Sequence, residues 1–199
     1  MNRQTQLKDI VTKNTGLVKT SGLLALGLKQ YEIRQLVREG KLIRVKQGYY
    51  QSGSSEQMSE EAQIAQLFPD GILCMYTALF FYGYSNRTHM AWDIAIDKNT
   101  SKSRFKLDYP YIQPYYLVSH LLTFGVTVAE YPDCKMQIFD RDRLICECLK
   151  YENKMDKETF NKAIQRYVAD SKKNIAKLLD YAEKRRVLHK VKDRIGVWL

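Results

Sequence analysis

The sequence lacks the segments that would place the protein in a membrane or direct it out of the cell. No apolar run approaches the roughly 18 residues of a membrane-spanning helix, and the longest candidate, residues 72–84, contains Gly83. The first residues lead into a polar stretch instead of the apolar core of a signal peptide. Hydrophobic residues make up 45% of the chain and charged residues 27%, so we expect a globular, cytoplasmic protein without a membrane partner.

Cysteine is scarce, and its spacing argues against a metal site. The four cysteines do not form the paired CxxC knuckles of a structural zinc site. Cys146 and Cys148 lie two positions apart in an expected helix, so their side chains point in different directions. We therefore expect buried free thiols in a reducing compartment, and neither a metal nor another cofactor.

The sequence also lacks a recognisable catalytic site. The histidines, His89, His120 and His189, have no ligand spacing, and no P-loop, GxSxG or kinase signature is present. A nucleotidyltransferase needs two close carboxylates to hold metal ions. Asp93 and Asp97 share a face of an expected strand, but they are about 13 Å apart and no Gly-Ser turn precedes them. We interpret them as solvated strand-end residues and predict that the protein is not an enzyme.

The net charge of +10 is unevenly distributed. Residues 1–50 carry 10 Lys and Arg against 3 Asp and Glu, which gives +7. Residues 51–149 carry 8 against 12, which gives −4, and residues 150–199 carry 14 against 7, which gives +7. Clustered positive charge is what a polyanionic partner requires, although an ordinary solvated surface remains an alternative, above all for the C-terminal block.

Residues 1–51 show the order of elements of a winged helix-turn-helix, a DNA-binding fold. Gly27 and Gly40 fit the left-handed turns that follow the second and third helices. Lys46-Gln47-Gly48 fits the turn of a hairpin. The expected elements are a helix over residues 5–13, a short helix capped by Thr20 that holds Leu23, Leu24 and Leu26, a helix over 29–39, and strands over 42–45 and 49–51.

The third helix carries the side chains that suit base edges. At 100° per residue, Ile33, Leu36 and Val37 form one apolar face. Arginine pairs with guanine O6 and N7, and glutamine with adenine N6 and N7. The opposite face presents Tyr31, Arg34, Gln35 and Arg38, with Gln30 at its border.

Basic residues around this helix are expected to hold phosphates of double-stranded DNA. Lys46 and Gln47 lie at the hairpin tip, and Lys41 and Arg44 just before it. Tyr49 and Tyr50 are interpreted as packing residues. The predicted DNA-contacting residues are Lys13, Lys19, Lys29, Gln30, Tyr31, Arg34, Gln35, Arg38, Lys41, Arg44, Lys46 and Gln47.

The four small residues Ser52–Ser55 predict a linker, which leaves residues 56–199 as a second domain. Apolar spacing predicts a mixed α/β domain followed by a helical C-terminal tail, so the fold class is α+β. The expected helices cover residues 59–68, 76–82, 141–151 and much of the last 45 residues, and the expected strands cover 90–96, 111–118, 124–131 and 135–139.

Residues 16–51 resemble the N-terminal domain of AbiEi-type antitoxins, and the strongest match is Leu36-Val-Arg-Glu-Gly-Lys-Leu-Ile-Arg-Val followed by Gly48-Tyr-Tyr. Later segments are similar more loosely: Tyr76-Thr-Ala-Leu-Phe-Phe-Tyr-Gly-Tyr, Gly125-Val-Thr-Val and Phe139-Asp-Arg-Asp-Arg-Leu-Ile-Cys-Glu-Cys-Leu. The resemblance implies a transcriptional autorepressor on an operator of inverted repeats. It also implies an antitoxin in phage defence by abortive infection that counteracts a nucleotidyltransferase-like toxin without a stable complex.

One departure from the family concerns the start of the third helix. A Ser or Thr cap is usual there, and Lys29 takes its place, at a cost of about 0.5–2 kcal/mol. Two other functions stay open. One is a ligand-responsive winged-helix transcription factor, which would have no toxin gene beside its own. The other is an accessory nuclease or nucleotidyltransferase, which would show metal-dependent activity.

Overall fold

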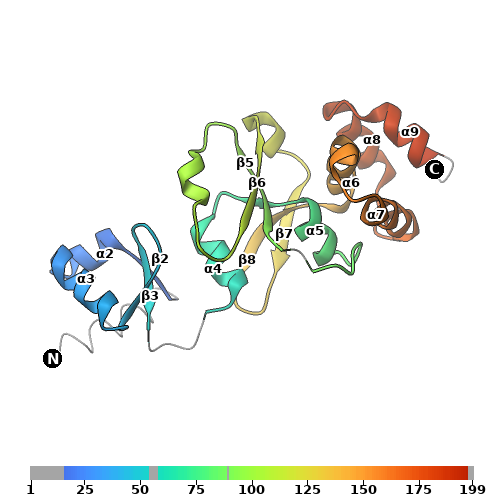
Figure 1. The fold of residues 1–199 in the computed structure, drawn as a ribbon. Coiled ribbons are helices and arrows are strands. Elements are labelled where there is room, and N and C mark those ends of the chain that lie inside the picture. The colour runs from blue at the N-terminus through green and yellow to red at the C-terminus, as the bar shows by residue number, and fades with distance from the viewer. Residues whose placement is uncertain (1–15, 54–57, 89, 197–199) are drawn as a thin grey trace. The chain divides into compact units, whose positions relative to one another are not determined.

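The computed structural model describes residues 16–53, 58–88 and 90–196, and it has helices and two β-sheets, a mixed α+β fold (Figure 1). The chain divides into two compact units. Unit 1 comprises residues 1–68 and 106–110, and unit 2 comprises residues 69–105 and 111–199. The expected helix over residues 5–13 and Lys13 lie outside the described residues, and the boundaries 1–51 and 56–199 stay predictions.

Among its described residues, unit 1 combines three short helices with a three-stranded antiparallel sheet in the order β1-β3-β2. Strand β1 was not expected from the sequence, and its three residues are too few to show an alternating pattern. Lys19, the last residue of β1, is the N-cap of α2, so the prediction of a Thr20 cap is wrong. The elements are β1 (Leu17–Lys19), α2 (Thr20–Ala25), α3 (Gln30–Arg38), β2 (Leu42–Lys46), β3 (Tyr49–Ser52) and α4 (Glu60–Leu67).

The ends of α2 and α3 follow from the glycines after them, as predicted. Gly27 and Gly40 have φ angles of +80° and +69°, values that favour glycine. After α3, the Gly40 N–H donates to the Val37 carbonyl and the Lys41 N–H to the Leu36 carbonyl, which closes the helix. The chain can therefore turn sharply from α3 into β2.

Unit 2 contains a mixed five-stranded sheet in the order β6-β5-β4-β8-β7. Strands β5–β6 and β4–β8 pair in parallel, and β4–β5 and β7–β8 pair antiparallel. The central strand β4 has only two residues, and it was not expected because so short a segment carries no period. The strands are β4 (Ile72–Leu73), β5 (Trp92–Asp97), β6 (Ile112–Leu117), β7 (Val126–Glu130) and β8 (Lys135–Phe139).

Helix α6 (Arg141–Tyr151) is the centre of the helical part of unit 2, and its residues 142–149 are all buried. It packs against α5 (Met75–Phe81), α7 (Lys157–Ala169), α8 (Ile175–Lys184) and α9 (Leu188–Arg194). Burial on all sides explains why α6 holds two free thiols, Cys146 and Cys148, in its interior, as the spacing predicted.

Asp93 corrects one interpretation of the sequence. It is buried, at 4% exposure, and its carboxylate accepts the Tyr76 N–H at 2.8 Å. Helix α5 has no side-chain cap of its own at Cys74, so Asp93 supplies that cap from the neighbouring strand. Asp97 does lie at a strand end, where it accepts from the Asn99 N–H at 2.8 Å. Asp93 is therefore a structural residue of the core and not a solvated strand end.

Candidate nucleic-acid interface

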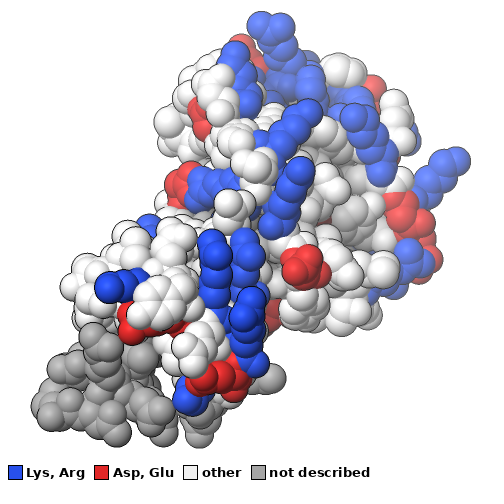
Figure 2. Space-filling model, turned by 60° about the vertical axis from the view of Figure 1, so that its left-hand side comes forward, with Lys and Arg blue, Asp and Glu red and all other residues white. Residues whose placement is uncertain are grey.

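The charge of the N-terminal region lies on its surface. Lysine and arginine side chains stand in groups on the face drawn in Figure 2, and aspartate and glutamate are sparser there. Residues 16–53 carry seven Lys and Arg and two Asp and Glu, a balance of +5. Most of these side chains are exposed, so their charge is available to a polyanionic partner.

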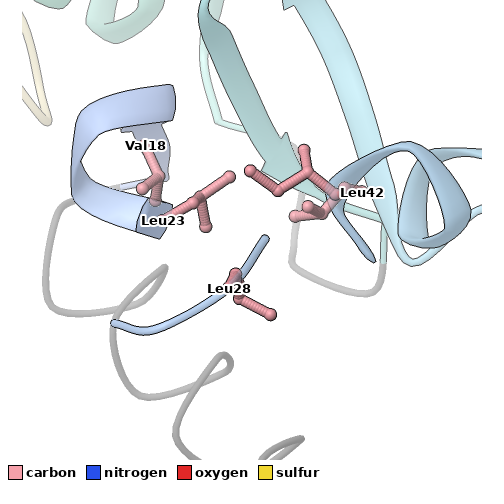
Figure 3. Close-up of a cluster of buried hydrophobic side chains, with 5 residues drawn as sticks. Val18, Leu23, Leu28 and Leu42 are labelled. Carbon is pink, nitrogen blue, oxygen red and sulfur yellow. The ribbon is translucent and has the colours of Figure 1, made fainter. Parts of the chain in front are cut away.

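The apolar face of α3 is held by the core of unit 1. Val18, Leu23, Leu28 and Leu42 converge from β1, α2, the turn after α2 and β2 (Figure 3). Ile33 joins this cluster, and the half-buried Leu36 and Val37 pack against it. These five buried apolar side chains come from different elements and fix the rotation of α3 about its axis, because turning the helix would expose Ile33 to water.

The opposite face of α3 is exposed, as the helical spacing predicted. Tyr31 has 61% of its surface accessible, and Arg34, Gln35 and Arg38 are exposed as well. Gln30 lies at the first turn and is also exposed. One row of hydrogen-bonding side chains thus stands on a helix whose orientation the core determines, which is the arrangement that base-edge recognition needs.

Glu32 supplies a capping interaction at the start of α3, where Lys29 takes the place of the usual Ser or Thr. Lys29 is the N-cap and its side chain accepts no hydrogen bond, as expected. The Glu32 carboxylate reaches back and accepts the Lys29 backbone N–H at 2.7 Å. A carboxylate in the first turn also interacts favourably with the helix dipole, so Glu32 offsets part of the missing cap. The three-residue spacing between Lys29 and Glu32 was a signal that our sequence analysis missed.

Glu39 accepts hydrogen bonds from two of the residues predicted to contact DNA, Gln35 and Lys41. The Lys41 ammonium donates to Glu39 at 2.7 Å, and the Gln35 amide donates to it at 2.9 Å. These bonds hold the pKa of Glu39 below its ordinary value. All three side chains are exposed, so water screens the interactions and DNA can compete for Gln35 and Lys41 at a modest cost.

The hairpin tip is less open than the sequence implied. Lys46 is half-buried, and its ammonium lies 4.9 Å from the centre of the Tyr49 ring and 5.4 Å from that of Phe68. The Lys19 ammonium lies 5.7 Å from the same Tyr49 ring. Tyr49 therefore holds two cations near the turn by cation–π interactions, and Gln47 is the exposed residue of the tip.

Arg44 stands in a mixed electrostatic environment. It lines a surface hollow of about 480 Å³ within unit 1, together with Glu60 and Asp108. Two carboxylates beside an arginine weaken the positive potential that attracts phosphate. Of the predicted contacts, Arg44 is accordingly less favourably placed than the α3 side chains.

Of the described residues predicted to contact DNA, the structure thus brings together those of α3 and places the others on the surface of unit 1. No helix among the described residues is long and apolar enough to cross a membrane. Within the same residues, no group of three or more His, Cys, Asp or Glu side chains could hold a metal ion.

Helices α2 and α3, joined by the turn at Gly27, give unit 1 a helix-turn-helix-like arrangement of the kind found in transcriptional regulators. Residues 6–53 match the family model described as transcriptional regulator, AbiEi antitoxin. This match of the N-terminal segment to a family of transcriptional regulators and antitoxins confirms the resemblance noted in the sequence.

Comparison with solved structures shows the fold of a larger part of the chain. The crystal structure of the RV2827C protein from Mycobacterium tuberculosis superimposes with a TM-score of 0.65 at 12% sequence identity. The match covers 92% of this chain and 74% of that chain, so the two proteins share a fold. No protein of curated function is significantly similar to the chain in sequence.

Proposed function

We propose that the protein is a DNA-binding autorepressor and antitoxin that counteracts a nucleotidyltransferase-like toxin without a stable complex. The observation that carries the proposal is the exposed row on α3, which lies in the segment that matches the AbiEi regulator family. Catalysis is not part of this function, since an antitoxin of this kind acts as a regulator.

Unit 1 would bind the operator as a winged helix. The order β1-α2-α3-β2-β3 and the pairing of β1 with β3 support that assignment. Helix α3 would enter the major groove, where Arg34 and Gln35 meet base edges. The hairpin of β2 and β3 would be the wing, with Gln47 at its tip. The lysines at positions 19, 29, 41 and 46 would hold phosphates on either side.

Inverted repeats in the operator would be read by two copies of the chain, because a two-fold repeat in DNA matches a two-fold arrangement of the protein. The remainder of the chain would then carry the neutralising role. Its action would not depend on repression alone, since the family resemblance implies protection without a tight complex with the toxin.

The two roles can be separated in the full-length chain. Arg34→Ala combined with Gln35→Ala should abolish repression of a reporter that carries the DNA upstream of the protein's own gene. Both side chains are exposed, so the fold should survive the change. Lys150→Ala, an exposed lysine of α6, serves as the matched surface control and should repress normally.

The same variants would then be expressed beside the toxin, with the toxin under an unrelated inducible promoter. We expect the α3 double variant to protect cells as well as the unmodified chain. Repression that persists in the double variant would refute DNA reading by α3. Loss of protection from a stable double variant would show that neutralisation requires DNA binding, and our division of roles would be wrong.

A further inference from the structure

Unit 2 contains a pocket of about 260 Å³ that the proposed function does not use. The pocket lies where the start of α5, the edge strand β6 and the segment after α6 meet. Its walls include Met75, Tyr76, Tyr115, Tyr116, Tyr151 and Lys154. Its volume lies slightly below the range of about 300–1,000 Å³ for sites of drug-sized ligands, so it has room for a ligand with a single ring.

The walls of the pocket suit a flat ring. Tyr115 and Tyr151 contact each other edge to face, with ring centroids 5.4 Å apart and an interplanar angle of 75°. An aromatic ligand can stack on one ring and meet the edge of the other in the geometry that aromatic pairs prefer. Methionine walls from Met75 and Met155 adapt to such a ring because the thioether is polarisable.

The Tyr115 hydroxyl supplies a polar group at the same place. Tyr115 is half-buried, and its hydroxyl is accessible to solvent and makes no hydrogen bond to any of the described residues. A ligand that enters the pocket and displaces water can accept a hydrogen bond from this hydroxyl. Burial and the nearby carboxylate of Asp93 keep the pKa of Tyr115 far above its ordinary value, so the hydroxyl stays neutral and can donate.

Lys154 gives the pocket a positive charge. Its ammonium lies 5.9 Å from the centre of the Tyr151 ring and forms no ion pair with any of the described residues. The neighbouring carboxylates are engaged elsewhere: Glu152 binds Lys190 at 3.1 Å and Arg194 at 2.6 Å, and Asp156 binds Arg87 at 3.1 Å. The cation at the pocket is therefore available to an anionic ligand.

The backbone at the pocket is also held in an uncommon conformation. Met75 has a φ angle of +41°, in the left-handed region that residues with side chains rarely adopt. The Asp93 carboxylate fixes the adjacent turn by accepting the Tyr76 N–H at 2.8 Å. Strained residues held by their surroundings occur preferentially at ligand sites, which agrees with the aromatic walls and the unpaired charge.

We propose that this pocket binds a small aromatic carboxylate, with the ring against Tyr115 and Tyr151 and the carboxylate on Lys154. The site is independent of the proposed DNA-binding function, because every residue that forms it lies in unit 2. The expected ligand has a planar ring and one negative charge. The limited volume of the pocket favours a ligand with a single ring over a nucleotide.

The test is titration calorimetry of the full-length protein with 4-hydroxybenzoate, 4-hydroxybenzyl alcohol and adenosine monophosphate. We expect 4-hydroxybenzoate to bind and the neutral alcohol to bind roughly three- to tenfold more weakly, since it lacks the charge. Lys154→Gln should weaken binding of the carboxylate by a similar factor and leave that of the alcohol unchanged. Lys157→Gln, an exposed lysine outside the pocket, is the matched control and should change neither.

Tyr115→Phe provides a second variant that keeps the ring and removes only the hydroxyl, and it should weaken both single-ring probes. Failure of 4-hydroxybenzoate to bind would overturn the proposal. Equal effects of Lys154→Gln and Lys157→Gln would place the bound carboxylate outside this pocket. Tighter binding of the nucleotide than of the single-ring carboxylate would show that the ligand class is wrong.

Discussion

Arginine has opposite roles in the two units. Arg34 and Arg38 of unit 1 are exposed on α3 and belong to a helix with one buried residue, Ile33. Arg143 and Arg185 of unit 2 are 0% and 6% exposed and share the carboxylate of Glu147, which is 2% exposed. The same side chain is thus a surface group available to a partner in one unit and a part of the core in the other.

The buried arginines show why local charge counts are a weak guide to binding. Arg143 donates to Glu147 at 2.7 Å, and Arg185 donates to the other oxygen of the same carboxylate at 2.6 Å. The Arg143 guanidinium also lies 4.0 Å from the centre of the Phe124 ring. Arg185 belongs to the basic C-terminal block of the sequence, yet its charge is used inside the protein and is not offered to a polyanion.

The largest expected effect tests the buried side of this comparison. Glu147→Gln removes the shared counter-ion and leaves two buried guanidinium groups uncompensated, so we expect a loss of about 3–5 kcal/mol in the free energy of unfolding. Urea unfolding measures it. Glu183→Gln, on the exposed surface of α8, is the control and should change stability by less than about 0.5 kcal/mol. A loss below about 1 kcal/mol for Glu147→Gln would mean that the network behaves like a surface ion pair.

A second prediction concerns Asp93, another buried carboxyl group of unit 2. Burial raises its pKa to about 7, against the opposing hydrogen bond from Tyr76. The unfolded chain has an ordinary pKa of about 3.9 here, so the folded state binds the extra proton between these values and stability falls as the pH rises through them. The contribution of Asp93 to the free energy of unfolding should fall by about 2 kcal/mol between about pH 5 and 7.

Asp93→Asn stays neutral and can still accept the Tyr76 N–H, so its unfolding free energy should lack this fall. Asp97→Asn is the control on the same strand. The Ser119 hydroxyl holds the pKa of Asp97 below its ordinary value, so its stabilisation is lost only in more acidic solution. Parallel pH profiles for the unmodified protein and Asp93→Asn would contradict the prediction.

The exposed arginine and glutamine of α3 are tested by DNA binding. Arg34→Ala and Gln35→Ala should each weaken specific operator binding by about 1–3 kcal/mol, with less effect on random DNA. Fluorescence anisotropy with both DNAs measures the difference. Equal losses on the two DNAs would show that these side chains do not read bases.

The smallest effect is expected at the hairpin. Lys46→Ala should reduce the magnitude of the slope of log binding constant against log salt by about one unit, because one phosphate contact disappears. The Lys46 ammonium contacts the Tyr49 and Phe68 rings, and it must leave both rings to reach a phosphate. This variant therefore tests directly whether the hairpin contacts DNA. A slope equal to that of the unmodified protein would place Lys46 away from the phosphates.

Short-range order explains what the sequence predicted correctly. The period of Ile33, Leu36 and Val37 predicted the faces of α3, and Gly40 predicted its end, because helical geometry and glycine's freedom at positive φ act within a few residues. Strands β1 and β4 escaped prediction, since strands of three and two residues are defined by their partners and not by a pattern of their own.

By itself, the sequence determined the amphipathic character of α3, the surplus of positive charge in the N-terminal region and the resemblance to the AbiEi family. Only the tertiary structure decided which charges face water. Asp93 looked like a solvated strand end and caps α5 from within the core, and Arg185 looked like part of a basic surface and pairs with Glu147. The physical reason is that burial depends on neighbours far away in the chain, such as residue 147 for residue 185, and no local pattern records them.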